Sequence, residues 1–203
     1  MQNVIAINAQ ASQSIASAQA IADETLLQSI SEGNRTSMHM LYCRHNVRVY
    51  RFILRIVRDS TAAEDLVSQV FLDVWRTAGQ FQGRSQVSTW LLSIARFKAL
   101  TAMRQRRFED IDQEDVRQIP DQADTPETSL DRSDTSAILR ACVQKLSPAH
   151  REIINLVYYH EKSVEEVGQI IGIPQSTVKT RMFYARKQLA DLLKGAGVER
   201  YAA

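Results

Sequence analysis

The stretch "SVEEVGQIIGIPQSTVKTRMFYARKQLADLL", residues 163–193, encodes a short helix, a tight turn and a longer basic helix. Ser163 and Glu166 form an S-x-x-E capping box, in which each side chain satisfies a free backbone N–H at a helix start. Gly172 suits the positive φ that ends such a helix, and Pro174 suits the start of the next one. The stretch therefore predicts a helix-turn-helix unit.

The second predicted helix has one apolar face and one polar face. Its polar side chains include several cations, and a basic helix of this kind can enter the major groove of DNA. A helical hairpin that packs on another protein is the alternative, and the rest of the chain is needed to distinguish this function from DNA binding. The apolar stripe, at spacings of three and four, is Val178, Met182, Ala185, Leu189 and Leu192, and the side chains off it are Lys179, Thr180, Tyr184, Arg186 and Lys187.

Composition limits the class of protein. Of the 203 residues, 44% are hydrophobic and 24% are charged, as in a soluble globular protein. No apolar run approaches the ~20 residues that span a bilayer, and the N-terminal residues show no secretory signal pattern. Two isolated cysteines, Cys43 and Cys142, give neither a disulfide framework nor a C-x-x-C motif. We therefore expect a cytoplasmic protein.

The net charge of +2 conceals three segments of different charge. Residues 108–134 contain ten acidic and two basic residues, whereas residues 1–107 and 135–203 are both net basic. Basic modules favour contacts with phosphates, and an acidic linker between them is expected to stay off DNA.

The predicted fold is all-α, because no segment alternates polar and apolar residues over a strand's length. We expect two small helical domains joined by an acidic linker, the C-terminal one a helix-turn-helix. The expected parts are a weakly ordered extension over 1–22, a larger bundle over 23–107, the linker over 108–134 and a smaller bundle over 135–203, with helices over 23–31, 36–58, 61–78 and 87–107 and a loop over 79–86.

Helix starts are predicted from capping residues. Thr61 and Glu64 make a second capping box, which is expected to open the helix over 61–78. Ser147–Pro148 is expected to cap the helix that precedes the helix-turn-helix, and Thr125–Pro126 is expected to start a helix within the linker region.

The stretch "AEDLVSQVFLDVW", residues 63–75, carries more apolar surface than a core face needs. At 100° per residue, Leu66, Val67, Val70, Phe71 and Val74 share one arc. Leu72 falls on the opposite side, with Trp75 at the edge. An outward Leu beside a large aromatic is typical of a protein-docking patch, and a scattered surface Leu with a half-buried Trp is the alternative.

Three stretches together carry a family resemblance. They are "AEDLVSQVFLDVWRTAGQF", "STWLLSIARFKALTAMRQRR" and "LSPAHREIINLVYYHEKSVEEVGQIIGIPQSTVKTRMFYARKQL". In this order and at these separations, the chain resembles a bacterial RNA polymerase sigma factor of the extracytoplasmic-function (ECF) group from about Met40 to Leu193. The resemblance implies two helical domains, regions 2 and 4, joined by an extended linker.

The resemblance implies that the first stretch docks on the clamp helices of the polymerase β′ subunit. The family often has Gln-Glu where this chain has Ser68-Gln69, so one charged contact of the family is absent here. The implied core polymerase-binding residues are Asp65, Ser68, Gln69, Leu72 and Trp75.

The second stretch and the loop before it resemble the part that opens promoter DNA and holds the non-template −10 strand. That task needs a pocket for an unstacked base and a basic track for phosphates. The family commonly has Asn and Asp where this chain has Phe97 and Thr101, which implies a different or less selective reading of one −10 base. Core packing is an alternative role for Trp90. The implied −10 residues are Arg84, Ser85, Gln86, Ser88, Trp90, Arg96, Lys98, Arg104, Arg106 and Arg107.

The third stretch resembles region 4, which reads the −35 element in the major groove and reaches the polymerase β flap. Arg or Lys can bridge guanine O6 and N7, and Thr or Ser can bond base edges or phosphates. Tyr184 stands where the family often has a basic residue. The implied −35 residues are Gln175, Ser176, Lys179, Thr180, Arg181, Tyr184, Arg186 and Lys187.

Other properties follow from the same resemblance. The protein is expected to act as a promoter-specificity subunit rather than an enzyme, and an anti-sigma factor is an expected partner. The acidic linker either threads toward the polymerase cleft or is a solvated tether. His39, Cys43 and His45 lack a fourth ligand and the spacing for a metal site, so no metal or cofactor is expected.

Two other functions remain open at this point. One is a stand-alone, dimeric helix-turn-helix regulator that binds a palindrome without polymerase. The other is an adaptor that binds only proteins. Promoter-dependent transcription with core polymerase distinguishes all three functions.

Overall fold

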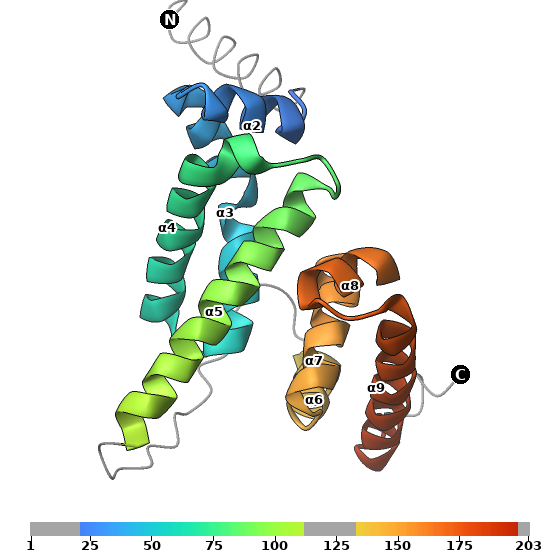
Figure 1. Cartoon of the computed structure of the whole chain (residues 1–203). Helices are drawn as coiled ribbons and strands as arrows, with labels where there is room; N and C mark the ends of the chain where they lie inside the picture. The colour runs from blue at the N-terminus through green and yellow to red at the C-terminus, as the bar shows by residue number, and fades with distance from the viewer. Residues whose placement is uncertain (1–20, 112–132, 199–203) are drawn as a thin grey trace, which may run out of the picture. The chain divides into compact units, whose positions relative to one another are not determined.

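The computed structural model describes residues 21–111 and 133–198, which fall in two compact units (Figure 1). All regular structure in these residues is helical, as the sequence predicts. The expectations for residues 1–20, for the cap at Thr125–Pro126 and for the path of the linker lie outside the described residues.

Within residues 21–111, the N-terminal unit is a bundle of four helices and one short 3₁₀ turn. The helix α3 (Arg35–Val57) packs against α2 (Asp23–Ser31), α4 (Ser60–Thr77) and α5 (Val87–Ile111), and the 3₁₀ turn Ala78–Gln80 follows α4. The fully buried side chains at its centre include Leu41, Phe52 and Ile53 of α3, Val70 of α4 and Leu91 of α5.

The amino end of α2 is tied to α3 by a charged cluster. The carboxylate of Asp23 lies 2.7 Å from Nε2 of His45, which is buried, and it also pairs with Arg44. Burial by itself would raise the pKa of Asp23, but the bonds to His45 and Arg44 outweigh burial and lower it.

The capping box predicted at Thr61 and Glu64 is wrong. The N-cap of α4 is Asp59, whose side chain accepts a hydrogen bond from the backbone N–H of Ala62 at 2.9 Å. The preceding residue, Arg58, takes a left-handed conformation (φ 56°) that ends α3, so the chain turns early enough for Asp59 to start the next helix. Because Asp caps at least as well as Thr, α4 begins at Ser60.

Two other helix boundaries differ from the prediction by a few residues. The helix α5 continues four residues beyond Arg107 to Ile111, into the stretch expected to be linker. At the other end of that stretch, its last two residues, 133 and 134, belong to α6 (Ser133–Gln144). Acidic residues alone do not stop a helix, since Glu and Asp are tolerated where packing does not exclude them.

The C-terminal unit contains α6, α7 (Pro148–Ile154), a π-helical turn (Asn155–Tyr159), α8 (Val164–Ile171) and α9 (Gln175–Gly195). The last helix packs against α6, α7 and α8. Its buried side chains include Val178, Ala185 and Leu193, and Ala185 packs in one cluster with Leu146 and Ile154.

The turn between α8 and α9 forms as predicted. Ser163 Oγ accepts from the backbone N–H of Glu166 at 3.2 Å, and a carboxylate oxygen of Glu166 accepts from the N–H of Ser163 at 2.9 Å. Gly172 has φ 77°, the left-handed conformation that favours glycine. A Cβ at Gly168 would lie 2.9 Å from the carbonyl oxygen of Ile173, so the turn folds closely back on α8. Ser147 caps α7, with Pro148 at the first helical position, again as predicted.

Candidate nucleic-acid and protein interfaces

The outer face of α4 carries the residues expected to bind a protein partner. The predicted core arc is confirmed, because Leu66, Val67, Val70, Phe71 and Val74 are all buried. Leu72 is 47% exposed, although its neighbour Phe71 is buried. Asp65, Ser68 and Gln69 are exposed on the same side of the helix, and Trp75 is half-buried at its edge.

A shallow hollow adjoins this outer face. It is lined by Trp75 together with Arg35 and Met38 from the start of α3. An aromatic side chain, a thioether and a guanidinium offer a partner both apolar contact and a charged hydrogen-bond donor. The hollow therefore extends the apolar surface of Leu72 and Trp75 toward α3.

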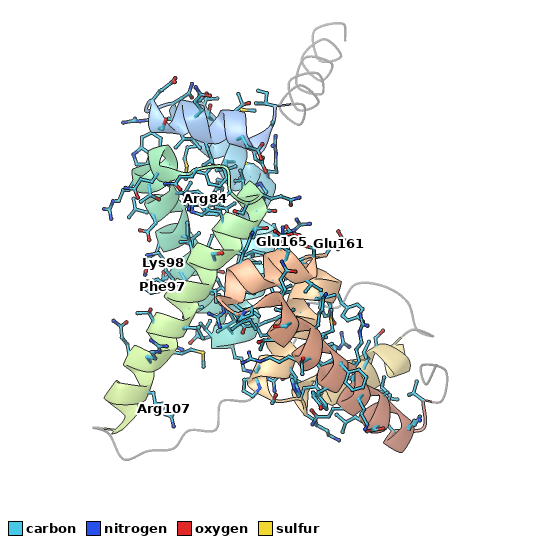
Figure 2. The ribbon with its side chains drawn as sticks, turned by 45° about the vertical axis from the view of Figure 1, so that its right-hand side comes forward. Arg84, Phe97, Lys98, Arg107, Glu161 and Glu165 are labelled. Carbon is cyan, nitrogen blue, oxygen red and sulfur yellow. The ribbon has the colours of Figure 1, made fainter. Side chains whose placement is uncertain are left out.

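The loop before α5 places short polar side chains at the start of that helix. Ser88 Oγ bonds Gln86 Oε1 at 3.4 Å, and Ser85 Oγ donates to the carbonyl of Gln86 at 3.3 Å. Arg84 is exposed in the loop just before them (Figure 2). Trp90 is half-buried, and its ring packs against Phe81 with centroids 5.3 Å apart. Both of its expected roles, core residue and support of the loop, fit this position.

Two of the cations of α5 pair with carboxylates of the same unit. Lys98 pairs with Asp73 of α4 at 2.8 Å, and Arg106 pairs with Asp59 at 3.0 Å. The N–H of Ala62 and then the Arg106 guanidinium hold the pKa of the Asp59 carboxyl below its ordinary value. Arg104 and Arg107 are exposed, and Figure 2 shows Arg107 toward the far end of α5. The helix α5 therefore carries two cations in ion pairs, Lys98 and Arg106, together with the exposed Arg104 and Arg107.

The amino-terminal half of α9 presents the side chains expected to reach a DNA groove. Gln175, Ser176, Lys179 and Thr180 are exposed, and Arg181 is half-exposed. Thr180 donates its hydroxyl hydrogen to the carbonyl of Ser176 at 3.0 Å, which leaves the oxygen's lone pairs able to accept a bond. These residues share the outer side of α9 because they recur at helical spacing.

Arg186 has an intramolecular partner. Its Nε donates to the hydroxyl of Tyr158 at 2.8 Å. The guanidinium carbon lies 5.7 Å from the centre of the same ring, but a bond to the ring's hydroxyl places the cation at the edge rather than over the face. Arg186 is thus positioned by the turn after α7, with its remaining N–H groups available for phosphate.

Two exposed aromatics adjoin the expected groove-facing residues, and the sequence reasoning named only one of them. Phe183 is 64% exposed and Tyr184 is 54% exposed, with their rings in an edge contact at 5.4 Å. Phe183 was not predicted, because it is apolar and the predicted DNA-binding residues are the polar side chains off the apolar stripe. Its position four residues after Lys179 and four before Lys187 was the signal that could have found it.

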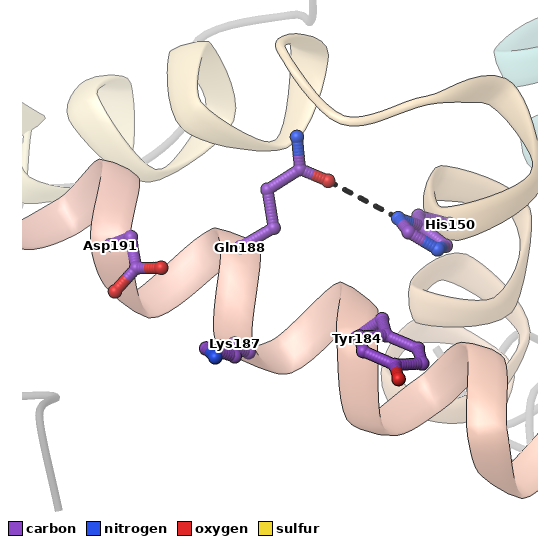
Figure 3. A pocket seen from close by; sticks show the side chains of 5 residues that line it. All are labelled: His150, Tyr184, Lys187, Gln188 and Asp191. Atoms are coloured by element: carbon purple, nitrogen blue, oxygen red, sulfur yellow. Dashed lines mark hydrogen bonds between the residues drawn. The ribbon is translucent and has the colours of Figure 1, made fainter.

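A second shallow hollow lies beside Tyr184 (Figure 3). In it, Nδ1 of His150 from α7 bonds Oε1 of Gln188 at 3.2 Å, and Lys187 and Asp191 complete the lining. The hollow combines a cation with a carboxylate, so it is not a simple phosphate pocket. The His150–Gln188 bond joins α7 to α9 at this hollow.

Two of the three candidate metal ligands on α3 lie together, and the third points elsewhere. Cys43 Sγ and His39 Nε2 lie 3.5 Å apart on one side of α3, whereas His45 is turned inward to Asp23. Within residues 21–111 and 133–198 no group of three or more metal-ligating side chains comes together. In the same ranges no helix is long and apolar enough to cross a membrane.

Comparison with known proteins places both units in one family. Residues 41–109 match the family model described as Sigma-70 region 2, and residues 142–191 match Sigma-70, region 4. The two matches occur in the same chain and in family order. The first contains the outer face of α4 and most of α5, and the second contains the helix-turn-helix.

Curated relatives match over nearly their whole length. The chain is 32% identical over 164 residues to the RNA polymerase sigma factor CarQ of Myxococcus xanthus, covering 80% of this chain and 92% of that protein. It is 30% identical to the ECF RNA polymerase sigma factor SigL of Mycobacterium tuberculosis, with the same coverage. The RNA polymerase sigma-H factor of Pseudomonas aeruginosa is 27% identical and is covered over 94% of its length.

Solved structures share the fold. The sigma factor RpoE from Bartonella quintana, solved in complex with the anti-sigma factor NepR, is 29% identical with a TM-score of 0.65, over 78% of this chain and 96% of that one. CnrH, solved with the cytosolic domain of CnrY, matches with a TM-score of 0.63 at 22% identity, over 86% of this chain and 99% of that one.

Proposed function

We propose a division of labour between the two domains of this chain, which belongs to the ECF group of sigma-70 RNA polymerase sigma factors. Sigma factors of this family bind core RNA polymerase and direct transcription initiation at promoters. They are DNA-binding initiation factors rather than enzymes. The stand-alone regulator is disfavoured, because the relatives match over both domains and not over the helix-turn-helix alone.

The outer face of α4 is the core-binding surface in this proposal. The observation that carries it is the exposure of Leu72, 47%, on a helix whose other large aliphatic side chains are buried. An exposed Leu beside a half-buried Trp can supply the desolvated centre of an interface, with the polar Asp65, Ser68 and Gln69 at its rim. The hollow beside Trp75 gives a partner's side chain a place to insert.

The loop over 81–86 and α5 form the −10 surface, and the outer side of α9 forms the −35 surface. Arg84, Arg104 and Arg107 are exposed cations suited to the backbone of a melted strand. On α9, Lys179 and Lys187 suit duplex phosphates, whereas Thr180, Arg181 and Tyr184 suit base edges. Binding of both elements by one chain would fix the spacing at which promoters are recognised.

An anti-sigma factor is the proposed regulator. The similar sigma factor from Bartonella quintana was solved in complex with one. An anti-sigma factor that covers the outer face of α4 or α9 would block polymerase or promoter binding directly. We place the protein in the cytoplasm, where core polymerase and promoter DNA are found.

Run-off transcription tests the function. Purified protein with core polymerase is expected to produce transcripts from a subset of a promoter library, and core polymerase alone is not. If no promoter-dependent transcript appeared with any member of the library, the sigma factor function would be rejected.

A double variant, Leu72→Asp with Trp75→Ala, tests the core-binding face. Loss of two interface anchors is expected to weaken binding to core polymerase by about 100-fold or more. Val47→Asp is a matched control, because Val47 is an exposed apolar residue on α3 of the same domain. Binding is measured by fluorescence anisotropy of labelled protein, with circular dichroism as the check on folding. Unchanged affinity in the double variant would show that the docking face lies elsewhere.

A further inference from the structure

An aromatic side chain projects from the middle of α5 without a packing role in its own domain. Phe97 is 71% exposed, more than any other large hydrophobic residue in the described parts of the chain. The buried side of α5 is formed by Leu91, Ala95 and Ala99. At 100° per residue Phe97 lies nearly opposite them. Exposing a Phe so fully gives no folding stability, so its ring is available for a ligand.

Phe97 lies on a stripe of residues that repeats every seven positions. Trp90 is seven residues before it and Arg104 is seven residues after it, which places all three on nearly the same side of α5. Seven residues of α-helix span about 10.5 Å. Ser93 and Thr101 lie between them on the same side. The stripe therefore carries aromatic rings, short polar side chains and one cation. It extends about two helical turns to each side of Phe97.

The charge around the stripe indicates which ligand it takes. Residues 87–107 contain five basic residues and no acidic one. Lys98, next to Phe97 in the sequence, pairs with Asp73 of α4, and Phe97 and Lys98 are labelled on the middle of α5 in Figure 2. Arg104 is exposed on the stripe itself. An exposed aromatic in a stretch that carries several cations and no acidic residue is the combination that binds single-stranded nucleic acid, by stacking of bases and attraction of phosphates.

We propose that Phe97 is a stacking platform for one unpaired base of the melted promoter strand. This inference rests on the proposed −10 role of α5 and adds a specificity-determining residue to it. A ring presents no directional donor or acceptor, so it holds any of the four bases with similar strength. A polar side chain at this place would select among bases by hydrogen bonds. The protein therefore requires a base at this position of the promoter but tolerates its identity.

An abasic scan with the complete holoenzyme tests the proposal. The probe is a fluorescent single-stranded oligonucleotide with the non-template −10 sequence of a promoter obtained from the library selection. A set of oligonucleotides replaces one nucleotide at a time by an abasic site, and binding is measured by anisotropy. Stacking of one base is expected to contribute about 5- to 100-fold in affinity. At one position, loss of the base should therefore weaken binding by that factor, while exchange among the four bases changes it far less.

Substitutions of Phe97 test whether its ring holds the base at this position of the oligonucleotide. Phe97→Ala should lower affinity for the intact oligonucleotide by the same factor but leave affinity for the oligonucleotide abasic at that position unchanged. Phe97→Tyr should bind like the wild type, and Phe97→Leu, large but not planar, should bind like Phe97→Ala. Met103→Ala is the matched control, because Met103 is an exposed apolar residue on another side of α5. Met103→Ala should bind every oligonucleotide like the wild type.

Several results overturn the proposal, and they are distinguishable from failure of the proposed function. If the wild-type holoenzyme bound the strand no better than core polymerase, the −10 function itself would fail. If it bound well but Phe97→Ala changed nothing, or weakened all oligonucleotides equally, Phe97 would not stack on a base. If Phe97→Ala left DNA binding intact and instead weakened a protein partner's binding, the ring would be a protein-docking residue.

Discussion

The helices α5 and α9 are both long and basic, and both carry exposed aromatic side chains, Phe97 on α5 and Phe183 and Tyr184 on α9, but their cations have different partners. In α5, Lys98 and Arg106 are paired with carboxylates of their own domain, at Asp73 and Asp59. In α9, Lys179 and Lys187 are exposed, and Arg186 bonds a tyrosine hydroxyl rather than a carboxylate. Pairing fixes a cation in one place, which suits a strand that must be held along one path. Exposed flexible cations suit duplex phosphates that recur on both sides of a groove.

The two helices also differ in how deeply they are packed. α5 buries Val87, Leu91, Leu92, Ala95 and Ala99 within the bundle formed with α3 and α4. α9 buries Val178, Ala185 and Leu193, with Leu189 and Leu192 only partly covered. More of the surface of α9 is therefore left for a ligand, and less of its stability comes from its own domain.

The largest expected effect concerns this packing. Leu91→Ala removes a fully buried side chain and should lower the free energy of unfolding of the N-terminal domain by about 3 kcal/mol. Leu189→Ala, at a partly covered site, should cost the C-terminal domain about 1 kcal/mol. Urea unfolding measures both, with the exposed Leu139→Ala as a control near zero. Equal losses at positions 91 and 189 would mean that α9 is as deeply packed as α5.

A charge-removal pair tests the proposed division of DNA binding. Arg104→Ala with Arg107→Ala should weaken holoenzyme binding to a single-stranded −10 oligonucleotide by about tenfold and lower the salt dependence by a slope of about 1.4. Lys179→Ala with Lys187→Ala should weaken binding to a −35 duplex by about tenfold and lower the salt dependence by a slope of about 1.8. Each double variant should leave binding to the other DNA ligand unchanged. Equal effects on both ligands would contradict the assignment of one helix to each form of DNA.

The cap of α8 should matter to the placement of α9. Ser163→Ala removes the side-chain acceptor for the Glu166 N–H and should lower the free energy of unfolding of the C-terminal domain by about 1 kcal/mol. Ser136→Ala, an exposed serine in α6, serves as a control in the same thermal unfolding measurement. If the two substitutions cost the same, the capping box would not stabilise the helix-turn-helix.

The smallest expected effect is the pH dependence of the stability that the Asp59–Arg106 ion pair contributes. Because the pKa of Asp59 is lowered, its charge stabilises the fold above the ordinary value of 3.8 and this contribution is lost as the pH falls through the lowered pKa. Asp59→Asn keeps the helix cap but loses the ion pair. It should melt slightly below the wild type at pH 7, and the gap should close in acid below pH 3.8. A gap that persisted in acid would show that the charge of Asp59 is not responsible.

Local sequence was enough to predict the parts that depend on near neighbours. The Ser163–Glu166 box and the αL glycine at 172 involve residues three to nine apart, and both are confirmed. The outward Leu72 is also confirmed, because helical geometry alone assigns it a side. The N-cap of α4 was mispredicted, since Asp59 and Thr61 are both able to cap and the left-handed Arg58 selected between them.

Contacts between distant residues could not be predicted in this way. Nothing near Lys98 indicates that Asp73, on another helix, neutralises it, and nothing near Arg186 indicates the hydroxyl of Tyr158. Helical spacing assigns Phe97 and Phe183 to the outer sides of α5 and α9, but how far each ring is exposed depends on what the other helices cover.

The sequence by itself determined that this protein is all-helical, that it has two basic modules and that one ends in a helix-turn-helix. Periodicity, caps and charge are properties of short stretches, and short stretches carry them without a fold. Only the tertiary structure decided which cations are already paired and how far the outward-facing aromatics are exposed. Those properties depend on what the other helices bury, because exposure and electrostatic pairing are set by residues far apart in the chain.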